Sequence, residues 1–286
     1  MSAPALITRL KDRYRERESL QGIRNVYHQY LHLRSARPVF FSIADLWRYH
    51  RLRRANRRFR EGNSTRPATL RLSALRGGSV QCRPGTTDDL VLMDTFRSQF
   101  HVPPIPLPDD AVIVDLGANV GFTALHLGTL FPHSRIIAVE MDDKNLAMGR
   151  ENTRALGERC VWVHAAIWNE DAVVSYSGAE EWGFRVTPGA TRMSRQVGAM
   201  TMGNLLDRLA IERVDYLKMD IEGAEARVLD GAAEWLDRVH AIRVEVHEPA
   251  TVDWCQGTLL RHGFRAFVDH RHWSCVAAVR DAKAPA

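Results

Sequence analysis

Residues 111–123 read Ala-Val-Ile-Val-Asp-Leu-Gly-Ala-Asn-Val-Gly-Phe-Thr, and this stretch decides the fold. The β-branched run at 112–114 is typical of a short strand that is buried on both faces of a sheet. Gly117 and Gly121 then bracket a tight turn, after which apolar residues recur with helical spacing. A strand, a glycine turn and a helix form the first half of a nucleotide-binding unit, and the helix start offers free N–H groups to an anionic group. The alternative is a glycine turn that serves packing alone.

The bulk composition indicates one main domain with an appendage. The chain has 286 residues, of which 45% are hydrophobic, and this is enough for one sizeable core. Its four cysteines include no Cys-x-x-Cys pair, so a disulfide framework and a zinc ribbon are disfavoured and we expect a reducing, cytoplasmic setting. The N-terminus lacks the apolar core of a signal peptide. No apolar run approaches roughly 18 residues, so no transmembrane helix is expected.

The net charge of +5 is unevenly spread along the chain. Residues 1–66 hold sixteen Lys or Arg against five Asp or Glu, a net +11, so the remaining 220 residues carry a net −6. We expect residues 1–66 to form a basic, mainly helical N-terminal extension, and residues 67–286 to form the main domain, with its ligand-binding core from about 111. Arginines among aromatic residues suit peripheral contact with an anionic membrane or a lipid-linked substrate. The alternative is a solvated arginine face on helices that pack against the main domain or a second subunit.

From residue 111 onward, strands and helices alternate, which is typical of a mostly parallel sheet with helices on both faces. The expected strands are 112–116, 135–140, 160–165, 213–219 and 241–247. The expected helices are 120–130, 143–155, 224–238 and 252–262. Two further strands, at 264–268 and 273–279, are joined by a short turn and should pair antiparallel.

Three other segments lie outside this alternation. Residues 167–200 are interpreted as an inserted β-hairpin or loop beside the ligand cleft. Residues 69–72 and 79–83 predict a separate hairpin across a Gly-Gly turn. Helices are expected at 4–34 and in the segment that follows Ser42, which is a candidate helix cap.

Glu140 ends the second expected strand, 23 residues after Gly117. An acid at this spacing can accept hydrogen bonds from both ribose hydroxyls of an adenosine cofactor. The alternative is a carboxylate that caps the helix at 143–155. Asn119 stands where a dinucleotide site commonly has a bare glycine facing the pyrophosphate, and this favours S-adenosylmethionine over NAD.

Three blocks of the sequence carry a family resemblance. Residues 112–121 read Val-Ile-Val-Asp-Leu-Gly-Ala-Asn-Val-Gly, residues 140–152 hold an acid followed by two spaced asparagines, and residues 214–225 read Val-Asp-Tyr-Leu-Lys-Met-Asp-Ile-Glu-Gly-Ala-Glu. In this order they resemble the FkbM-type S-adenosylmethionine-dependent methyltransferases. Residues 83–88 and 244–247 also agree, so the resemblance covers about 70–280. The chain departs at His101, where tyrosine is usual, and at 201–204, where the family tends to have Thr-Leu-Asp.

The resemblance implies an α/β fold with a Rossmann-like class I methyltransferase sheet of seven strands, mostly parallel with an antiparallel C-terminal strand. It also implies O-methylation of a hydroxyl, with S-adenosyl-L-methionine as the cofactor. Known acceptors in such families include sugars of glycolipids and signalling oligosaccharides, and macrolide-type natural products. The residues expected to bind the cofactor are Asp115, Gly117, Asn119, Gly121, Glu140 and Ala166, which follows the third strand.

Asp220 and His247 are the expected catalytic residues. Asp220 ends the fourth strand at the cofactor edge of the sheet, where it could act as a general base, an anchor for the acceptor hydroxyl or a metal ligand. The alternative is a structural carboxylate paired with Lys218, which must be paired if it is buried. His247 ends the fifth strand and could serve as a base, although a structural histidine is an equal alternative.

Four further residues near these strand ends carry weaker signals. A metal cluster of Asp220, Glu245 and His247 is possible, but the sequence offers nothing further to support a divalent metal. Glu225 follows on the turn into the next helix and is interpreted as mainly structural. His270 and His272 are expected to be exposed at a strand turn rather than ligating.

The sequence therefore predicts an S-adenosylmethionine-dependent O-methyltransferase of secondary metabolism that acts on a sugar-containing or polyketide-like small molecule or glycoconjugate. A nucleic-acid methyltransferase is the first alternative, because the N-terminal extension is rich in arginine. It is disfavoured because no Asn-Pro-Pro-Tyr-like block follows the fourth strand. A non-catalytic membrane- or partner-binding protein is the second alternative, and an NAD oxidoreductase is the third. The acceptor, the methylated position and the oligomeric state are left open.

Overall fold

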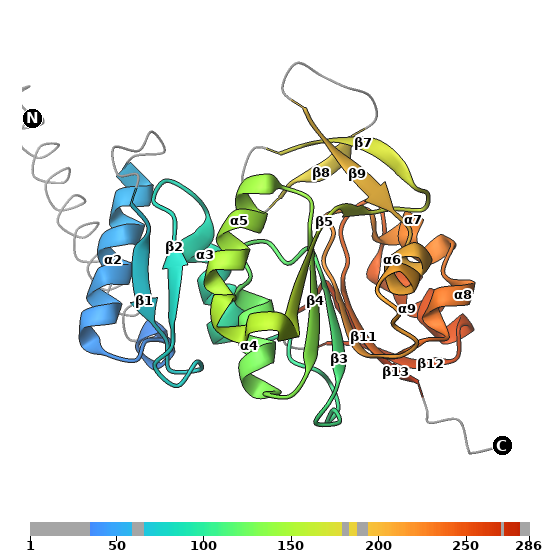
Figure 1. Cartoon of the computed structure of the whole chain (residues 1–286), viewed down its shortest axis with the longest axis horizontal. Coiled ribbons are helices and arrows are strands. Elements are labelled where there is room, and N and C mark those ends of the chain that lie inside the picture. The colour runs from blue at the N-terminus through green and yellow to red at the C-terminus, as the bar shows by residue number, and fades with distance from the viewer. Residues whose placement is uncertain (1–34, 59–65, 179–182, 188–193, 270–271, 281–286) are drawn as a thin grey trace, which may run out of the picture.

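A computed structural model describes residues 35–58, 66–178, 183–187, 194–269 and 272–280. Its centre is a seven-stranded sheet in the order β12-β13-β11-β10-β3-β4-β5 (Figure 1). The strands are β3 (Val112–Leu116), β4 (Arg135–Glu140), β5 (Cys160–His164), β10 (Val214–Met219), β11 (Val239–Glu245), β12 (Phe264–Val268) and β13 (Cys275–Arg280). Neighbouring strands are parallel except at β13, which runs antiparallel to β11 and β12. The predicted Rossmann-like sheet with its antiparallel C-terminal strand is confirmed.

Helices cover both faces of this sheet. Consecutive residues of a strand point to opposite faces, so Ile113 joins the hydrophobic cluster on one face and Val114 the cluster on the other. On one side lie α4 (Phe122–Leu130) and α5 (Asp143–Asn152) (Figure 1). On the other side lie α6 (Met202–Arg208), α7 (Glu225–Asp230), α8 (Ala233–Leu236) and α9 (Val252–Arg261). Both faces being buried explains the unbroken apolar runs in the central strands.

An N-terminal layer packs beside α5. It consists of a short turn η1 (Arg37–Val39), helix α2 (Ile43–Arg58) and the hairpin β1 (Ala68–Arg71) and β2 (Ser79–Cys82). Ser42 accepts a hydrogen bond from the Asp45 backbone at 3.2 Å, as expected of a cap. Phe40 and Tyr49 belong to the same hydrophobic cluster as Ile113 of the central sheet. The helix expected at 4–34 lies outside the described residues.

Two helical segments connect this layer to the cavity. Helix α3 (Asp88–Met93) continues into the π-helical turn η2 (Asp94–Ser98). Asn56 of α2 donates a hydrogen bond to Asp89 Oδ1 at 2.8 Å, which fastens α2 to α3.

The inserted segment forms a second, four-stranded sheet. Its strands β6 (Ala166–Ile167), β7 (Ala172–Ser177), β8 (Arg185–Thr187) and β9 (Arg195–Met200) pair in the order β6-β9-β7-β8. Figure 1 shows this sheet above the ends of β4 and β5. The expected β-hairpin is therefore the antiparallel pair of β7 and β9, extended by one strand on each side.

Several predicted boundaries are wrong. The helix expected at 224–238 is two short helices, because α7 ends at Gly231, a residue with low helix propensity. The helix expected at 143–155 stops at Asn152 and is followed by the 3-10 turn η3 (Arg154–Arg159). The strand expected at 241–247 covers Val239–Glu245 instead, so His247 lies in the loop beyond it.

In the part of the chain that the structure describes, no helix has both the length and the apolar composition that a membrane span requires.

Candidate functional site

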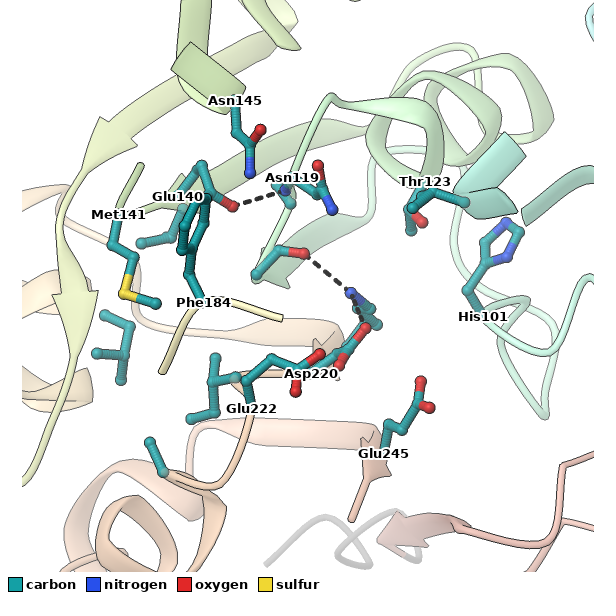
Figure 2. A pocket seen from close by; sticks show the side chains of 18 of the residues that line it. His101, Asn119, Thr123, Glu140, Met141, Asn145, Phe184, Asp220, Glu222 and Glu245 are labelled. Atoms are coloured by element: carbon teal, nitrogen blue, oxygen red, sulfur yellow. Dashed lines mark hydrogen bonds and ion pairs between the residues drawn. The ribbon is translucent and has the colours of Figure 1, made fainter. Parts of the chain in front are cut away.

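A cavity opens at the carboxyl ends of β3, β4 and β10, beside the glycine turn (Figure 2). Gly117 has φ +72°, and a Cβ atom there would lie 1.8 Å from the carbonyl oxygen of Asp220. Only glycine allows the end of β3 to approach the end of β10 this closely. Gly121 has φ +79° and directly precedes α4. The turn therefore brings the start of α4 and the tip of β10 to opposite sides of one cavity.

Glu140 ends β4 and lies in contact with this turn. One carboxylate oxygen accepts a hydrogen bond from the Asn119 backbone and the other accepts one from the Asp142 backbone, each at 2.8 Å. Burial raises the pKa of Glu140 to about 7. The helix-cap alternative does not apply to this carboxylate, because Asp142 caps α5 by accepting from the Lys144 and Asn145 backbones. Glu140 lines the cavity with acceptor positions to spare.

The residues expected to bind the cofactor separate into two groups. Gly117, Asn119, Glu140 and Ala166 line the cavity. Asp115 and Gly121 are not among its lining residues, and their contacts are with neighbouring parts of the fold. Asp115 is fully buried with its Oδ1 3.4 Å from the Lys218 ammonium, and a Cβ on Gly121 would meet Gly149 and Trp162 at 3.0 Å.

Lys218 joins the tips of β3 and β10. Its Nζ lies 3.4 Å from Asp115 Oδ1 and 3.2 Å from Asp220 Oδ2, and it donates a hydrogen bond to the Gly117 carbonyl at 3.1 Å. Burial lowers the pKa of this ammonium, but the two carboxylates outweigh burial and raise the pKa above its ordinary value. The buried lysine is paired, as its charge requires, and it holds Asp220 at the cavity wall.

A carboxylate–histidine cluster, formed by Asp220, Glu222, Glu245 and His247, lies at the end of β10 and β11. The His247 Nε2 atom is 3.9 Å from Asp220 Oδ1, 3.8 Å from Glu222 Oε2 and 3.9 Å from Glu245 Oε1. Its Nδ1 atom is 2.9 Å from Glu225 Oε1. Glu225 is fully buried and also accepts hydrogen bonds from the Ile221 and Gly223 backbones. It therefore connects the His247 ring to the turn that follows β10.

The cluster shifts the proton affinity of two of its members. Burial lowers the pKa of His247, but the hydrogen bond to Glu225 and the neighbouring carboxylates raise it above its ordinary value. Burial and the charge of Asp220 raise the pKa of Glu245. An imidazole with a raised pKa keeps its proton near neutral pH and is a poor base there. The geometry therefore favours a positioning role for His247 in the absence of a bound cation.

The expected metal trio changes in one member. The described residues whose ligand atoms all lie within 4.8 Å of one another are Asp220, Glu222 and His247, so Glu222 takes the place of Glu245. Glu222 has φ +55° and precedes Gly223 at φ +96°, and this turn directs it to the cluster. The only hint of this in the sequence is the spacing of two residues between the two acids at a strand end.

The wall opposite the glycine turn comes partly from residues that sequence reasoning missed. His272 was expected to be exposed, but it is half-buried and lines the cavity. Its ring lies 4.7 Å from the Phe100 ring, and its Nε2 lies 3.8 Å from Glu245 Oε1. The cause is the turn before β13, where the His272 backbone bonds to Asp269 and brings the ring over the sheet edge. His270 lies outside the described residues.

Segment η2 and the inserted sheet close the remaining sides. Asp94 and Thr95 come from η2, and Phe184 and Val186 come from the inserted sheet. Arg195 of β9 forms an ion pair with Asp142 and lies 5.2 Å above the Phe184 ring. The inserted sheet is thus fastened to the residue that caps α5, directly beyond Glu140.

Several known proteins are similar to this chain in sequence or in structure. The model of the methyltransferase FkbM domain matches residues 115–272. Methyltransferase 1 of Beauveria bassiana is 25% identical over 194 residues, which cover 59% of this chain and 78% of that protein. Methyltransferase sdnD of Sordaria araneosa is 26% identical over 205 residues, which cover 59% and 79%. The solved precorrin-6y C5,15-methyltransferase of Geobacter metallireducens is similar at a TM-score of 0.38 and 16% identity, over 61% of this chain and 82% of that one.

Proposed function

The chain belongs to the FkbM methyltransferase family, and we propose that it transfers the methyl group of S-adenosylmethionine to a hydroxyl oxygen of a sugar-containing or polyketide-like metabolite. The observation that carries the proposal is that Glu140 and Asp220 face one cavity from opposite sides of the Gly117 turn (Figure 2). An adenosine-binding acid and an acceptor-side acid are then both within reach of one bound cofactor.

The residues of the cavity fit this cofactor. Asn119 Oδ1 is buried with no hydrogen-bond partner among the described residues, so it offers a vacant acceptor to the amino-acid end. Glu140 offers acceptor positions to the ribose hydroxyls. Ala166, Ile167, Phe184 and Val186 add apolar wall beside Glu140, which suits an adenine ring.

The proposed chemistry needs orientation more than acid–base assistance. S-adenosylmethionine supplies a methyl group on a positively charged sulfur, and the methyl moves to the acceptor oxygen while the sulfur keeps the electrons of the broken bond. Asp220 accepts a hydrogen bond from the acceptor hydroxyl and receives its proton as the new bond forms. A base in this position contributes about 10²–10⁴-fold, whereas in-line placement supplies roughly 7–11 kcal/mol in favourable cases.

The acceptor side supports a sugar-containing substrate. The Phe100 and His272 rings lie 4.7 Å apart and share the cavity wall with Thr95. Flat rings beside a few polar groups suit a sugar, which has an apolar face and hydroxyls at its edge. Acidic side chains at 94, 220, 222 and 245 also line this end, and they favour a neutral or cationic acceptor over an anionic one.

One experiment tests the central claim. Calorimetry with S-adenosylhomocysteine should give binding for the wild-type protein and weaker binding for Glu140→Ala. Labelled methyl transfer is then measured to glycosides and to matched glycosides that lack one hydroxyl. We expect transfer only where that hydroxyl is present. Unchanged affinity of Glu140→Ala would refute the ribose assignment, and transfer only to amines would refute O-methylation.

We also propose that the N-terminal layer contacts an anionic membrane surface. Arg48, Arg51, Arg66 and Arg71 line a groove between α2 and β1, around the buried Asp45. Phe41, just before α2, and Ile43 and Trp47, in its first turns, are each more than half exposed. Exposed apolar residues beside arginines are typical of membrane-surface helices. The four cysteines are free thiols, which supports a cytoplasmic setting.

The vesicle test compares two double variants of equal charge change. Arg51→Gln with Arg66→Gln should reduce binding to phosphatidylglycerol vesicles by about thirtyfold, since each basic residue near an anionic surface is worth about 1 kcal/mol. Arg150→Gln with Arg154→Gln, on α5 and η3, should leave it unchanged. Equal loss in both variants, or equal binding to phosphatidylcholine vesicles, would contradict a specific docking surface.

A further inference from the structure

We propose that Asp220, Glu222 and His247 bind a divalent cation of the Mn²⁺ class at the acceptor end of the cavity. These three residues are the only set among the described residues whose possible ligand atoms gather in this way, all within 4.8 Å of one another. The site itself does not depend on the proposed function. Only its consequence for the acceptor rests on that proposal.

The geometry leaves a space between the ligand atoms. The His247 Nε2 atom lies 3.9 Å from Asp220 Oδ1 and 3.8 Å from Glu222 Oε2. These separations are too long for hydrogen bonds. Adjacent ligands of an octahedral cation with bonds of about 2.1–2.2 Å lie roughly 3 Å apart, and opposite ligands about 4.3 Å apart. These two separations fall between the limits, and the atoms of Asp220 and Glu222 lie within 4.8 Å of each other, so side-chain adjustments can bring all three onto one ion.

A buried carboxylate fixes the orientation of the histidine. Glu225 Oε1 lies 2.9 Å from His247 Nδ1, and Glu225 is itself held by the backbones of Ile221 and Gly223. Metal-ligating histidines commonly donate their second N–H to a carboxylate or carbonyl in this manner. When Nδ1–H donates a hydrogen bond to Glu225, the other ring nitrogen, Nε2, faces the cluster, where a bound cation would take its lone pair in place of a proton. An ordinary patch of acidic residues lacks a histidine that a buried carboxylate holds in this orientation.

The local charge also calls for a cation. Asp220, Glu222 and Glu245 all surround Nε2 within 3.9 Å. Lys218 lies 3.2 Å from Asp220, but it is shared with Asp115 and the Gly117 carbonyl. Arg185 lies 3.5 Å from Glu222 on the half-exposed outer side. Carboxylates in a partly buried site need compensation, and a divalent ion supplies it at the centre of the group.

The donor set indicates the kind of ion. Two carboxylates and one imidazole suit Mn²⁺ and its neighbours Co²⁺ and Zn²⁺ better than Ca²⁺ or Mg²⁺, which prefer oxygen ligands alone. Three protein ligands leave positions open on the ion. Since the cluster borders the cavity through Asp220 and Glu222, an open position faces the acceptor.

This gives the ion a defined role in the proposed reaction. A cation-bound acceptor hydroxyl loses its proton more readily, as bound water does. With the ion bound, Asp220 would be a ligand instead of the base proposed above, and Glu245 would be the carboxylate left to receive the hydroxyl proton. The oxygen lone pair forms the bond to the methyl group as the bond to sulfur breaks.

The test is a Mn²⁺ titration of the full chain followed by electron paramagnetic resonance, in the presence of S-adenosylhomocysteine. We expect one Mn²⁺ per chain for the wild-type protein. Glu222→Gln and His247→Gln should each weaken Mn²⁺ binding at least tenfold. Glu225→Gln, through the orientation of His247, should weaken it 10- to 100-fold. Glu245→Gln and the exposed Glu248→Gln should retain it within threefold.

Several outcomes separate this proposal from the proposed function. Melting curves identify any variant that has lost its fold, and the other of the two ligand variants then decides. Nucleoside binding without Mn²⁺ binding overturns the cation site and leaves the function standing. Mn²⁺ binding without nucleoside binding supports the cation site and overturns the proposed function. Equal loss in Glu222→Gln, Glu245→Gln and Glu248→Gln would indicate diffuse attraction to acidic groups and would also overturn the site.

Discussion

The Lys218 ammonium lies 3.2 Å from Asp220 Oδ2 and 3.4 Å from Asp115 Oδ1, so it connects the acceptor-side carboxylate to β3, the strand before the glycine turn. The same ammonium bonds to the Gly117 carbonyl at 3.1 Å. Asp220 therefore cannot turn away from the cavity without breaking a buried ion pair. Its structural pairing and its proposed role toward the acceptor are compatible, because Lys218 contacts Oδ2, Asp220 lines the cavity, and Oδ1 lies 3.9 Å from the nearest histidine nitrogen.

Lys218→Met should unfold the protein more easily. It leaves Asp115 fully buried without its cation, and breaking one side of a buried pair costs about 3–5 kcal/mol. Denaturant unfolding measures the change. Lys144→Met makes the same substitution at an exposed position and should change the free energy of unfolding by less than about 0.5 kcal/mol. Equal effects of the two substitutions would show that the pairing at Lys218 contributes nothing.

Gly117→Ala should abolish nucleoside binding and lower the melting temperature. The new Cβ would lie 1.8 Å from the Asp220 carbonyl oxygen, so the turn must move away from β10. Gly157→Ala is the matched control, because Gly157 also has positive φ but no atom within 4 Å of the added Cβ. Its φ of +58° and ψ of −140° lie in a backbone region that favours glycine, so this control carries a backbone penalty of about 1–3 kcal/mol but no clash. Calorimetry that finds normal nucleoside affinity in Gly117→Ala would contradict the close approach.

Nucleoside affinity should fall as the pH drops through about 7. Burial raises the pKa of Glu140 to about 7, and its protonated form offers fewer acceptor positions to the ribose hydroxyls. If only the ionised form binds well, affinity should fall about tenfold between pH 8 and pH 6. Calorimetry over this range should give a nearly flat profile for Glu140→Gln. A wild-type profile that is equally flat would mean that this carboxylate does not titrate against the ligand.

Asp220→Asn should bind nucleoside normally but turn over slowly. The amide keeps the shape of the side chain but neither accepts a proton nor ligates a cation well, so kcat should fall about 10²–10⁴-fold. Asp230→Asn changes an exposed carboxylate at the end of α7 and should leave kcat unaltered. Stopped assays with saturating acceptor separate kcat from KM. Wild-type turnover in Asp220→Asn would remove Asp220 from the chemistry.

The sheet was predictable because its signals are local. The β-branched run at 112–114 and the positions of Gly117 and Glu140 are readable from neighbouring residues, and the structure has β3, the turn and β4 there. The single helix expected at 224–238 fails at Gly231 for a reason that is also local, but propensity alone does not fix the break. Strand ends are harder, which is why β11 and β13 differ from their expected limits.

The candidate site was predictable only in part, because its geometry depends on tertiary structure. Glu222 enters the cluster through two consecutive residues of positive φ, which sequence spacing does not reveal. His272 reaches the cavity because β13 pairs with β11 and its preceding turn folds over the sheet edge. Phe100 follows η2 and lines the cavity, but it was not among the residues expected at the site. Local patterns locate the nucleoside half of the cavity, while the acceptor half is assembled by distant segments.

Helix α2 shares one hydrophobic cluster with the central sheet, and it is fastened through Asn56 to α3, whose continuation η2 lines the cavity. The arginine groove and the cavity mouth are therefore connected through one packed core. A ligand bound by these arginines would therefore have a defined position relative to the cavity. A substrate tethered to that same surface would be delivered along a fixed approach instead of arriving from every direction.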